Sequence, residues 1–273
     1  MRKPAAVGFY PSSKIELENF VKKCIASYKK INNPLGAIVP HAGYTYSGAV
    51  AGATLKSAET EKRNFFIFCP NHTGYGSAVA SSSEDWQTPL GTVKVNTKIT
   101  DNINRFLGVK VDESAHKHEH SAEVQLPFLQ VLYKDFTIVP ICFSFVELKD
   151  LERLAKYIAS FSNDSFFIAS SDFIHFGPMY GYVPAGGSVK AQLEWVKKHD
   201  MNMIEKICNL DAFGFYETVT ENEYTVCGYV PITLLMLIMK NIGAAKGRLM
   251  KYMSSYDTQP NSSFVSYAGI VFE

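Results

Sequence analysis

Short, continuous apolar runs alternate along the chain with longer stretches in which apolar and polar positions are mixed. The runs predict buried strands at residues 35–40, 64–70, 136–143, 165–170 and 263–272, and an alternating stretch predicts a partly exposed strand at 92–98. The intervening stretches predict helices at 14–31, 47–57, 100–107, 122–133, 147–161, 188–209 and within 223–241. This pattern is typical of an α/β fold, with a central, largely parallel or mixed sheet and helices on both faces.

No shift in composition, internal repeat or low-complexity segment divides the chain, so we expect a single domain over residues 1–273. The 27 basic and 26 acidic side chains nearly balance, which argues against a nucleic-acid partner or an acidic membrane surface. The longest apolar run, "VPITLLMLIM", is about half as long as the ~20 residues of a membrane-spanning helix, and it predicts a core helix. The oligomeric state stays open.

The five cysteines are irregularly spaced and include no C-x-x-C pair, which disfavours a zinc finger. We expect reduced thiols in a cytoplasmic protein, and the N-terminal apolar stretch is too short for a signal peptide. Cys24, Cys69, Cys142 and Cys208 fall on predicted apolar positions and are expected in the core. Cys227 lies outside such a position and is considered with the candidate site.

Polar clusters directly follow three of the predicted buried strands. His41 follows the first strand, Asn71 and His72 follow the second, and Asp172 and His175 follow the run "FFIAS". If these strands are parallel neighbours, their carboxyl ends border one crevice, where open α/β sheets bind their ligands. Two imidazoles on rigid strand ends make a good start for a metal site.

The third ligand is left open among Asp172, Glu119 and Cys227. A carboxylate would complete the two-histidine, one-carboxylate arrangement of oxygen-activating non-haem iron enzymes, whereas a thiolate would suit a softer metal or a redox role. Cys227 precedes a predicted turn into a helix. Because a helix N-terminus lowers the pKa of a thiol, this position favours ligation or reactivity.

Three further histidines alternate in the segment "HKHEH". We expect His116 and His118 on a surface loop. Glu119 and His120 come just before a predicted helix, where backbone amides attract anions, and we expect them beside the site with a role in its chemistry.

The Asp172–His175 pair predicts a general acid or base, since a carboxylate commonly orients an imidazole. Tyr44, Tyr46 and Asn71 are expected to line the substrate pocket. No phosphate-binding glycine loop and no G-x-S-x-G elbow occur, which disfavours a nucleotide enzyme or an ordinary α/β hydrolase.

Five ordered motifs, "PHAGYTYSG", "PNHTG", "EHSAEVQLPFL", "SSDFIHFG" and "TVCGYVPI", resemble those of the Memo family. Its prokaryotic members are often called AmmeMemoRadiSam system protein B. The motifs span residues 40–232, and the family's closing "SYAG" recurs at 266–269, so the resemblance covers nearly the whole chain. It implies a fold similar to that of class III extradiol dioxygenases of the LigB type, which hold non-haem iron between two histidines and a glutamate.

The resemblance also implies roles for individual residues. By motif, His41 and His72 match the metal histidines, and Cys227 takes the place of the dioxygenase glutamate. The resemblance further pairs Asp172 with His175 in the pocket and identifies Glu119 and His120 as its acidic–histidine motif. Because a thiolate changes the charge, softness and redox properties of a metal, dioxygenase activity does not follow from the resemblance alone.

Three hypotheses for the function remain. The first is an enzyme with iron or copper and redox or dioxygenase-like chemistry on an unknown small substrate. The second is a non-catalytic binding module that holds a small anion or a peptide in the same pocket. The third is a zinc hydrolase, because two histidines and a thiolate also suit zinc.

Overall fold

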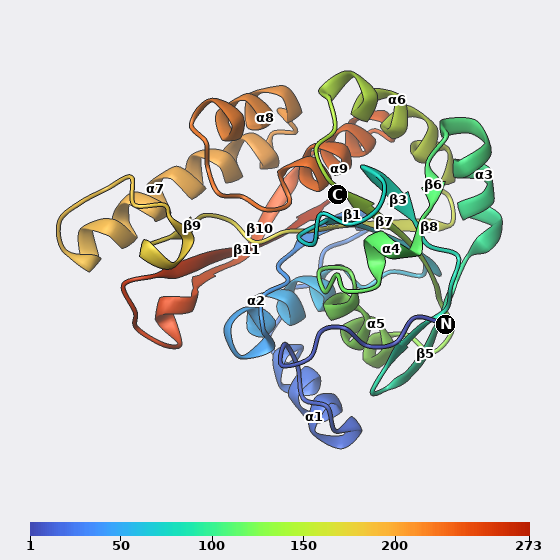
Figure 1. Cartoon of the computed structure of the whole chain (residues 1–273), viewed down its shortest axis with the longest axis horizontal. Helices are drawn as coiled ribbons and strands as arrows, with labels where there is room; N and C mark the ends of the chain where they lie inside the picture. The colour runs from blue at the N-terminus through green and yellow to red at the C-terminus, as the bar shows by residue number, and fades with distance from the viewer.

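Eleven strands form the central sheet in a computed structural model that describes residues 1–273 (Figure 1). The main path runs β10-β11-β1-β8-β2-β7-β3-β6, with β4, β5 and β9 beside it. The strands are β1 Gly36–Val39, β2 Asn64–Pro70, β3 Val79–Ser81, β4 Trp86–Thr88, β5 Gly91–Val95, β6 Lys110–Val111, β7 Thr137–Phe143, β8 Ser165–Ser170, β9 His175–Phe176, β10 Gly247–Ser254 and β11 Phe264–Phe272. Strands β1, β8, β2 and β7 are parallel, whereas β11 is antiparallel to β1, which confirms a mixed sheet.

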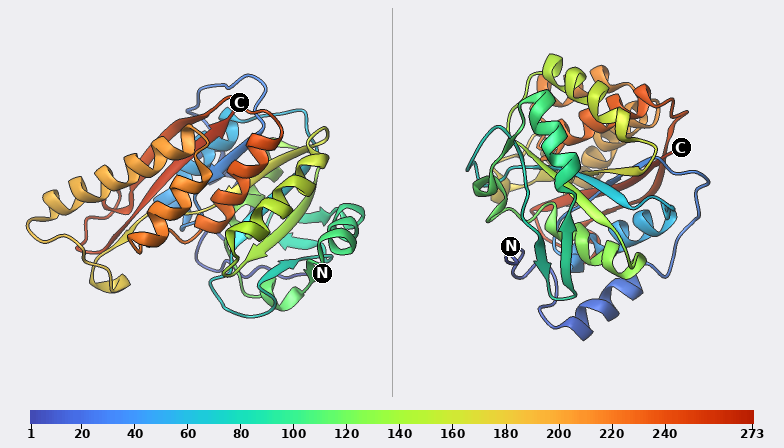
Figure 2. Two further views of the ribbon diagram at one scale, coloured as in Figure 1. Left: turned by 90° about the horizontal axis from the view of Figure 1, so that it is seen from above. Right: turned by 90° about the vertical axis from the view of Figure 1, so that its right-hand side faces the viewer.

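Helices cover both faces of this sheet, as the sequence predicts (Figure 2). The α-helices are α1 Lys14–Cys24, α2 Tyr44–Ser57, α3 Thr97–Leu107, α4 Glu113–His116, α5 Leu126–Leu132, α6 Leu148–Ile158, α7 Val189–Cys208, α8 Ala212–Glu221 and α9 Tyr229–Asn241. Short 3₁₀ helices are η1 Glu123–Gln125, η2 Ala159–Phe161, η3 Pro178–Tyr180 and η4 Ser255–Asp257. No helix combines the length and the apolar composition that a membrane crossing requires.

The alternating side chains of the central strands divide the core into two layers. Ile38 and Phe66 pack on one face, with apolar residues of α6, α7, α8 and α9. Ala37 and Phe65 point to the other face, against α1, α2 and α5. Because both faces are covered, these strands are apolar at consecutive positions instead of every second one.

The structure departs from the predicted elements in a few places. The first helix ends at Cys24 instead of continuing to residue 31, and Tyr28 beyond it is exposed. The helix predicted at 122–133 begins late, at Leu126, because Pro127 is restricted to the first turn of a helix; a 3₁₀ turn precedes α5. Helix α8 and strand β10 were not predicted. The buried residues of α8, Ala212, Phe215 and Val219, do follow a helical spacing, whereas β10 lacks an alternating pattern of burial.

The order β1-β8-β2 is what positions the candidate site. These three strands are adjacent and parallel, so their carboxyl ends meet at one edge of the sheet. His41, Asp172 and His72 each lie two residues beyond one of these ends. The expected convergence of the three polar clusters is therefore correct.

Candidate metal centre

His41 is held on three sides immediately after β1. Its backbone N–H donates to Oδ1 of Asp172 at 2.8 Å, and its ring Nδ1 lies 3.0 Å from Oγ of Ser170. The other ring nitrogen, Nε2, lies 3.2 Å from Sγ of Cys227. Burial of the ring, together with the neighbouring histidines, lowers the pKa of His41 well below its usual value, so the imidazole is neutral near pH 7.

His72 follows β2 and is held by the buried carboxylate of Glu119. The backbone N–H of His72 donates to Oε2 at 2.6 Å, and ring Nδ1 lies 3.0 Å from Oε1. The N–H of Ser121 holds the same carboxylate at 2.9 Å. Since a carboxylate accepts hydrogen bonds, Nδ1 of His72 carries the proton and Nε2 is directed away from Glu119.

The surroundings of His72 favour a positive charge on its ring, which lies between Glu119 and Cys227. Burial acts to raise the pKa of Glu119, but the hydrogen bond and charge of His72 outweigh it and lower the value to about 2. Burial likewise acts to lower the pKa of His72, but Cys227 and Glu119 on its two sides raise it to about 11. A proton or a metal cation on Nε2 of His72 is therefore stabilised from both sides.

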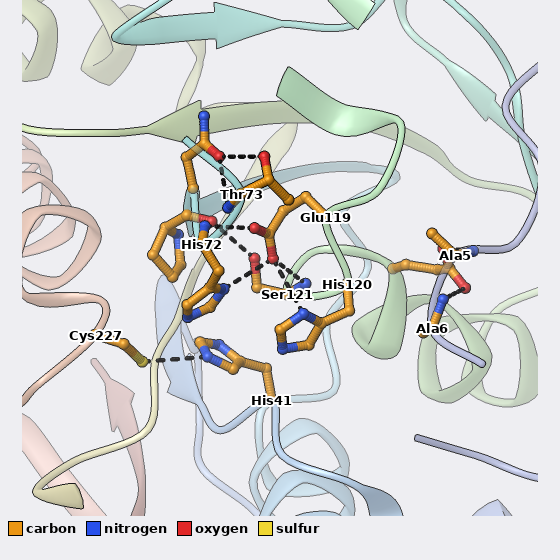
Figure 3. A network of polar contacts seen from close by, with 12 residues as sticks. Ala5, Ala6, His41, His72, Thr73, Glu119, His120, Ser121 and Cys227 are labelled. Atoms are coloured by element: carbon orange, nitrogen blue, oxygen red, sulfur yellow. Dashed lines mark hydrogen bonds and ion pairs between the residues drawn. The ribbon is translucent and has the colours of Figure 1, made fainter. Parts of the chain in front are cut away.

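Cys227 lies just before α9, as predicted, and its sulfur meets both histidines. One donor atom from each of His41, His72 and Cys227 lies within 4.8 Å of the other two. Figure 3 shows the rings of His41, His72 and His120 facing one another, with Cys227 beside His41. The expectation of a lowered thiol pKa is wrong: burial raises the pKa of Cys227 and outweighs the hydrogen bond from His72.

The donor set of His41, His72 and Cys227 fits a transition metal, and the geometry favours Cys227 as the third donor beside these two histidines. Asp172 is engaged with the N–H groups of His41 and Ala42, and Glu119 is engaged with His72. Glu119 forms a second group of close donor atoms with His72 and His120, whereas the sulfur of Cys227 is the third donor of the group that contains both His41 and His72. Iron, copper and zinc all accept imidazole and thiolate together, and deprotonation of the thiol would accompany binding.

His120 lies beside this group, as expected. Its ring centre is 4.9 Å from that of His72 and 5.5 Å from that of His41, and its Nδ1 is 3.3 Å from Glu119. Burial lowers the pKa of His120 to about 4, although Glu119 acts against this shift. Phe9 packs against the ring in a tilted arrangement at a centre distance of 4.1 Å.

The predicted Asp172–His175 pairing is wrong in its details. Asp172 supports the backbone of His41, as described above, and makes no hydrogen bond to the ring of His175. Nδ1 of His175 instead faces two backbone oxygens, those of Thr225 at 2.8 Å and Phe173 at 3.0 Å. Because carbonyl oxygens only accept, Nδ1 carries a proton, so in a neutral ring the lone pair lies on Nε2.

A cavity of about 380 Å³ opens over the group. It is lined by Phe9, His41, Ala42, Gly43, Tyr46, His72, His120, Asp172, His175, Met179, Tyr180, Ser255, Gln259, Asn261, Ser263, Val265 and Tyr267. Tyr46 lines it as expected and donates to Oε1 of Gln259 at 2.7 Å.

Two residues expected in the pocket lie elsewhere. Tyr44 is buried in the core among Tyr10, Phe20 and Phe128, because it stands in the first turn of α2 on the side that faces the core. Its hydroxyl donates to a backbone oxygen. The side chain of Asn71 closes the turn after β2, where its Oδ1 accepts from the N–H groups of residues 73 and 74. Asn71 therefore shapes the loop that carries His72.

Of His116 and His118, which were both predicted on a surface loop, one is exposed and the other is buried. His118 is exposed, but His116 is fully buried at the end of α4. Its Nε2 contacts the backbone oxygen of Ala80 at 3.1 Å, and its ring packs on Trp86. The charged residues around His116 predict an exposed segment, but in the folded protein the N-terminal residues of the chain cover it.

Several residues of the site were not predicted. Phe9 comes from the start of the chain, and nothing in its neighbourhood indicates that it reaches His120. Ser170 and Gln125 stand within the quoted motifs "SSDFIHFG" and "EHSAEVQLPFL", which is the one signal that could have drawn attention to them. Their contacts depend on which side chains the fold brings together.

The fold and the site define an α/β protein with a histidine–histidine–cysteine group at the carboxyl ends of parallel strands. The sequence matches the family described as "Memo-like protein" over residues 2–271, and the chain belongs to this family. A "MEMO1 family protein" of Methanosarcina mazei is 41% identical over 100% of this chain and 99% of its own length. Another from Methanosarcina barkeri is 39% identical, with both chains fully covered.

A solved structure adds a comparison at the level of the fold. The uncharacterized protein JW3007 from Escherichia coli K12 has a TM-score of 0.51 with this chain, covering 86% of this chain and 98% of its own. The two sequences are only 12% identical. The similarity therefore concerns the arrangement of sheet and helices and says nothing about a shared activity.

Proposed function

We propose that the chain is a metal-dependent redox enzyme in which His41, His72 and Cys227 hold iron or copper. The observation that carries this proposal is the group of three donor atoms within 4.8 Å of one another. In each histidine, Nδ1 faces a protein partner and Nε2 is directed towards the group. Metal-binding histidines in proteins are typically held in this way, through the nitrogen that does not bind the metal.

The chain's own residues would divide the work around the cavity. A bound iron or copper ion would supply Lewis acidity or electron transfer. His175 lines the cavity with Nδ1 held by two backbone oxygens, so Nε2 of its neutral form is the candidate base for a substrate proton. His120 is neutral near pH 7, and Phe9 packs on its ring, so the two shape the cavity wall without adding charge.

Two other functions are supported by specific observations. The donor set equally suits zinc, which would favour hydrolysis instead of redox chemistry. The cavity with its aromatic and amide side chains would also suit a non-catalytic module for a small molecule or a peptide. No lysine or arginine lines the cavity, so His72, whose pKa is raised to about 11, is the cation that an anionic ligand would meet there.

Elemental analysis of protein purified anaerobically and without chelator tests the proposal. The wild type is compared with Cys227→Ser and with Cys208→Ser, a control thiol at the end of α7. Near-stoichiometric iron or copper in the wild type and the control, with a clear loss in Cys227→Ser, is the expected result. Metal content that is equal in all three proteins would refute the assignment of Cys227.

The remaining outcomes separate the alternatives. Zinc in place of iron or copper would move the search to oxygen-independent hydrolysis. If the wild type carries no metal and takes up none on titration, the metal proposal fails, and small-molecule binding to the cavity becomes the function to test.

A further inference from the structure

A buried chain of hydrogen bonds runs from the backbone to the ring of His41. It begins at the side-chain amide of Gln125, whose Nε2 lies 3.0 Å from the backbone oxygen of Pro40 and 3.0 Å from Oγ of Ser170. A carbonyl oxygen accepts and never donates, so the nitrogen of this amide, not its oxygen, must face Pro40. Gln125 therefore also donates to Ser170.

The hydroxyl of Ser170 has one proton, and its direction is determined as well. Oγ of Ser170 lies 2.7 Å from the backbone oxygen of Ser121, which can only accept. The proton of Ser170 is thus committed to Ser121. The remaining neighbour of Oγ is Nδ1 of His41 at 3.0 Å, and towards it Ser170 has only a lone pair to offer.

We infer that Ser170 is a positioning residue that selects the tautomer of His41 with the proton on Nδ1. The opposite tautomer would place two acceptors, Nδ1 and the oxygen of Ser121, against a single hydroxyl proton. With Nδ1 protonated, the lone pair of Nε2 points to Cys227, 3.2 Å away. The consequence for metal binding rests on the proposed function, whereas the tautomer follows from the hydrogen bonds alone.

Ser121 connects this chain of hydrogen bonds to His72. Its N–H donates to the carboxylate of Glu119, which sets His72, while its C=O receives the proton of Ser170, which sets His41. Both rings are thus oriented from the two sides of one peptide segment. The backbone of Ser121 cannot be removed by substitution, so the chain of hydrogen bonds is interrupted by substituting Ser170.

Long-range ¹H–¹⁵N NMR correlations of the metal-free, full-length protein test the inference. The ring signals of His41 are assigned by their absence in His41→Asn. We expect a protonated Nδ1 in the wild type and, in Ser170→Ala, a population shift to the tautomer with protonated Nε2. Ser165→Ala is the matched control, because Ser165 is a buried serine of the same strand whose hydroxyl has no partner.

A Zn²⁺ competition titration supplies the second readout. Affinity is expected to fall about 10–100-fold in Ser170→Ala, as for other residues that orient a metal-binding histidine, and to stay unchanged in Ser165→Ala. A protonated Nε2 in the wild type would overturn the inference without any variant, so it remains decidable even if Ser170→Ala does not fold. An unchanged tautomer in folded Ser170→Ala would also overturn it. Absence of metal binding by the wild type would refute the proposed function and leave the NMR result to decide the tautomer.

Discussion

Removal of the Arg2 side chain tests how the N-terminus supports the site. Arg2 is 5% exposed, and its guanidinium pairs with the buried carboxylate of Glu123 at 2.6 Å. It also donates to the backbone oxygens of His116 and Glu119. The N-terminal segment therefore holds the loop that brings Glu119 to His72.

The substitution Arg2→Met would leave the carboxylate of Glu123 buried without its counter-charge. Two backbone N–H groups and the hydroxyl of Tyr10 still donate to that carboxylate, so it keeps part of its support. Breaking a buried ion pair by removing one partner costs about 3–5 kcal/mol, a large share of the roughly 5–15 kcal/mol that stabilises a typical protein. We therefore expect Arg2→Met to lower the free energy of unfolding by about 3 kcal/mol.

Urea unfolding followed by circular dichroism measures this loss, with Lys3→Met as the control. Lys3 is the next residue but is exposed and reaches only Gln87, so its substitution should change stability by less than about 0.5 kcal/mol. Metal uptake should weaken in Arg2→Met alone, because the segment carrying Glu119 loses its anchor. If Arg2→Met is no less stable than Lys3→Met, the reasoning about the buried pair is wrong.

Two further substitutions have defined outcomes. Burial raises the pKa of Asp200 from 3.8 to about 7, so the unfolded chain releases this proton first and wild-type stability falls as the pH rises from about 4 to 7. Asp200→Asn keeps an acceptor for Tyr252 and should remove this fall, which amounts to about 3 kcal/mol between the two conditions of the assay, urea unfolding at pH 4.5 and at pH 7.5. Identical pH dependence in both proteins would contradict it. In Gly228→Ala the new Cβ would lie 2.6 Å from the backbone oxygen of Ser170. We expect the free energy of unfolding to fall by about 1–3 kcal/mol and metal uptake to weaken. In the control Gly186→Ala the new Cβ meets no atom within 4 Å, so this variant should behave as the wild type in both assays.

The sequence by itself predicted the framework of the molecule. Continuous apolar runs indicated strands covered on both faces, and the polar residues after them indicated where the site lies. His41 and His72 could be placed together because strand ends are local features, and parallel strands present them at one edge. Cys227 was a candidate for the same reason, since the start of its helix could be read from the chain.

The tertiary structure alone decided which partners these residues meet. Asp172 supports the backbone of His41 instead of the ring of His175, and Tyr44 lies in the core instead of the pocket. Arg2 and Glu123 are 121 positions apart in sequence and form a buried ion pair. Apolar periodicity records which face of an element is buried, but a hydrogen bond depends on atoms that distant segments bring within about 3 Å, and no local pattern encodes that meeting.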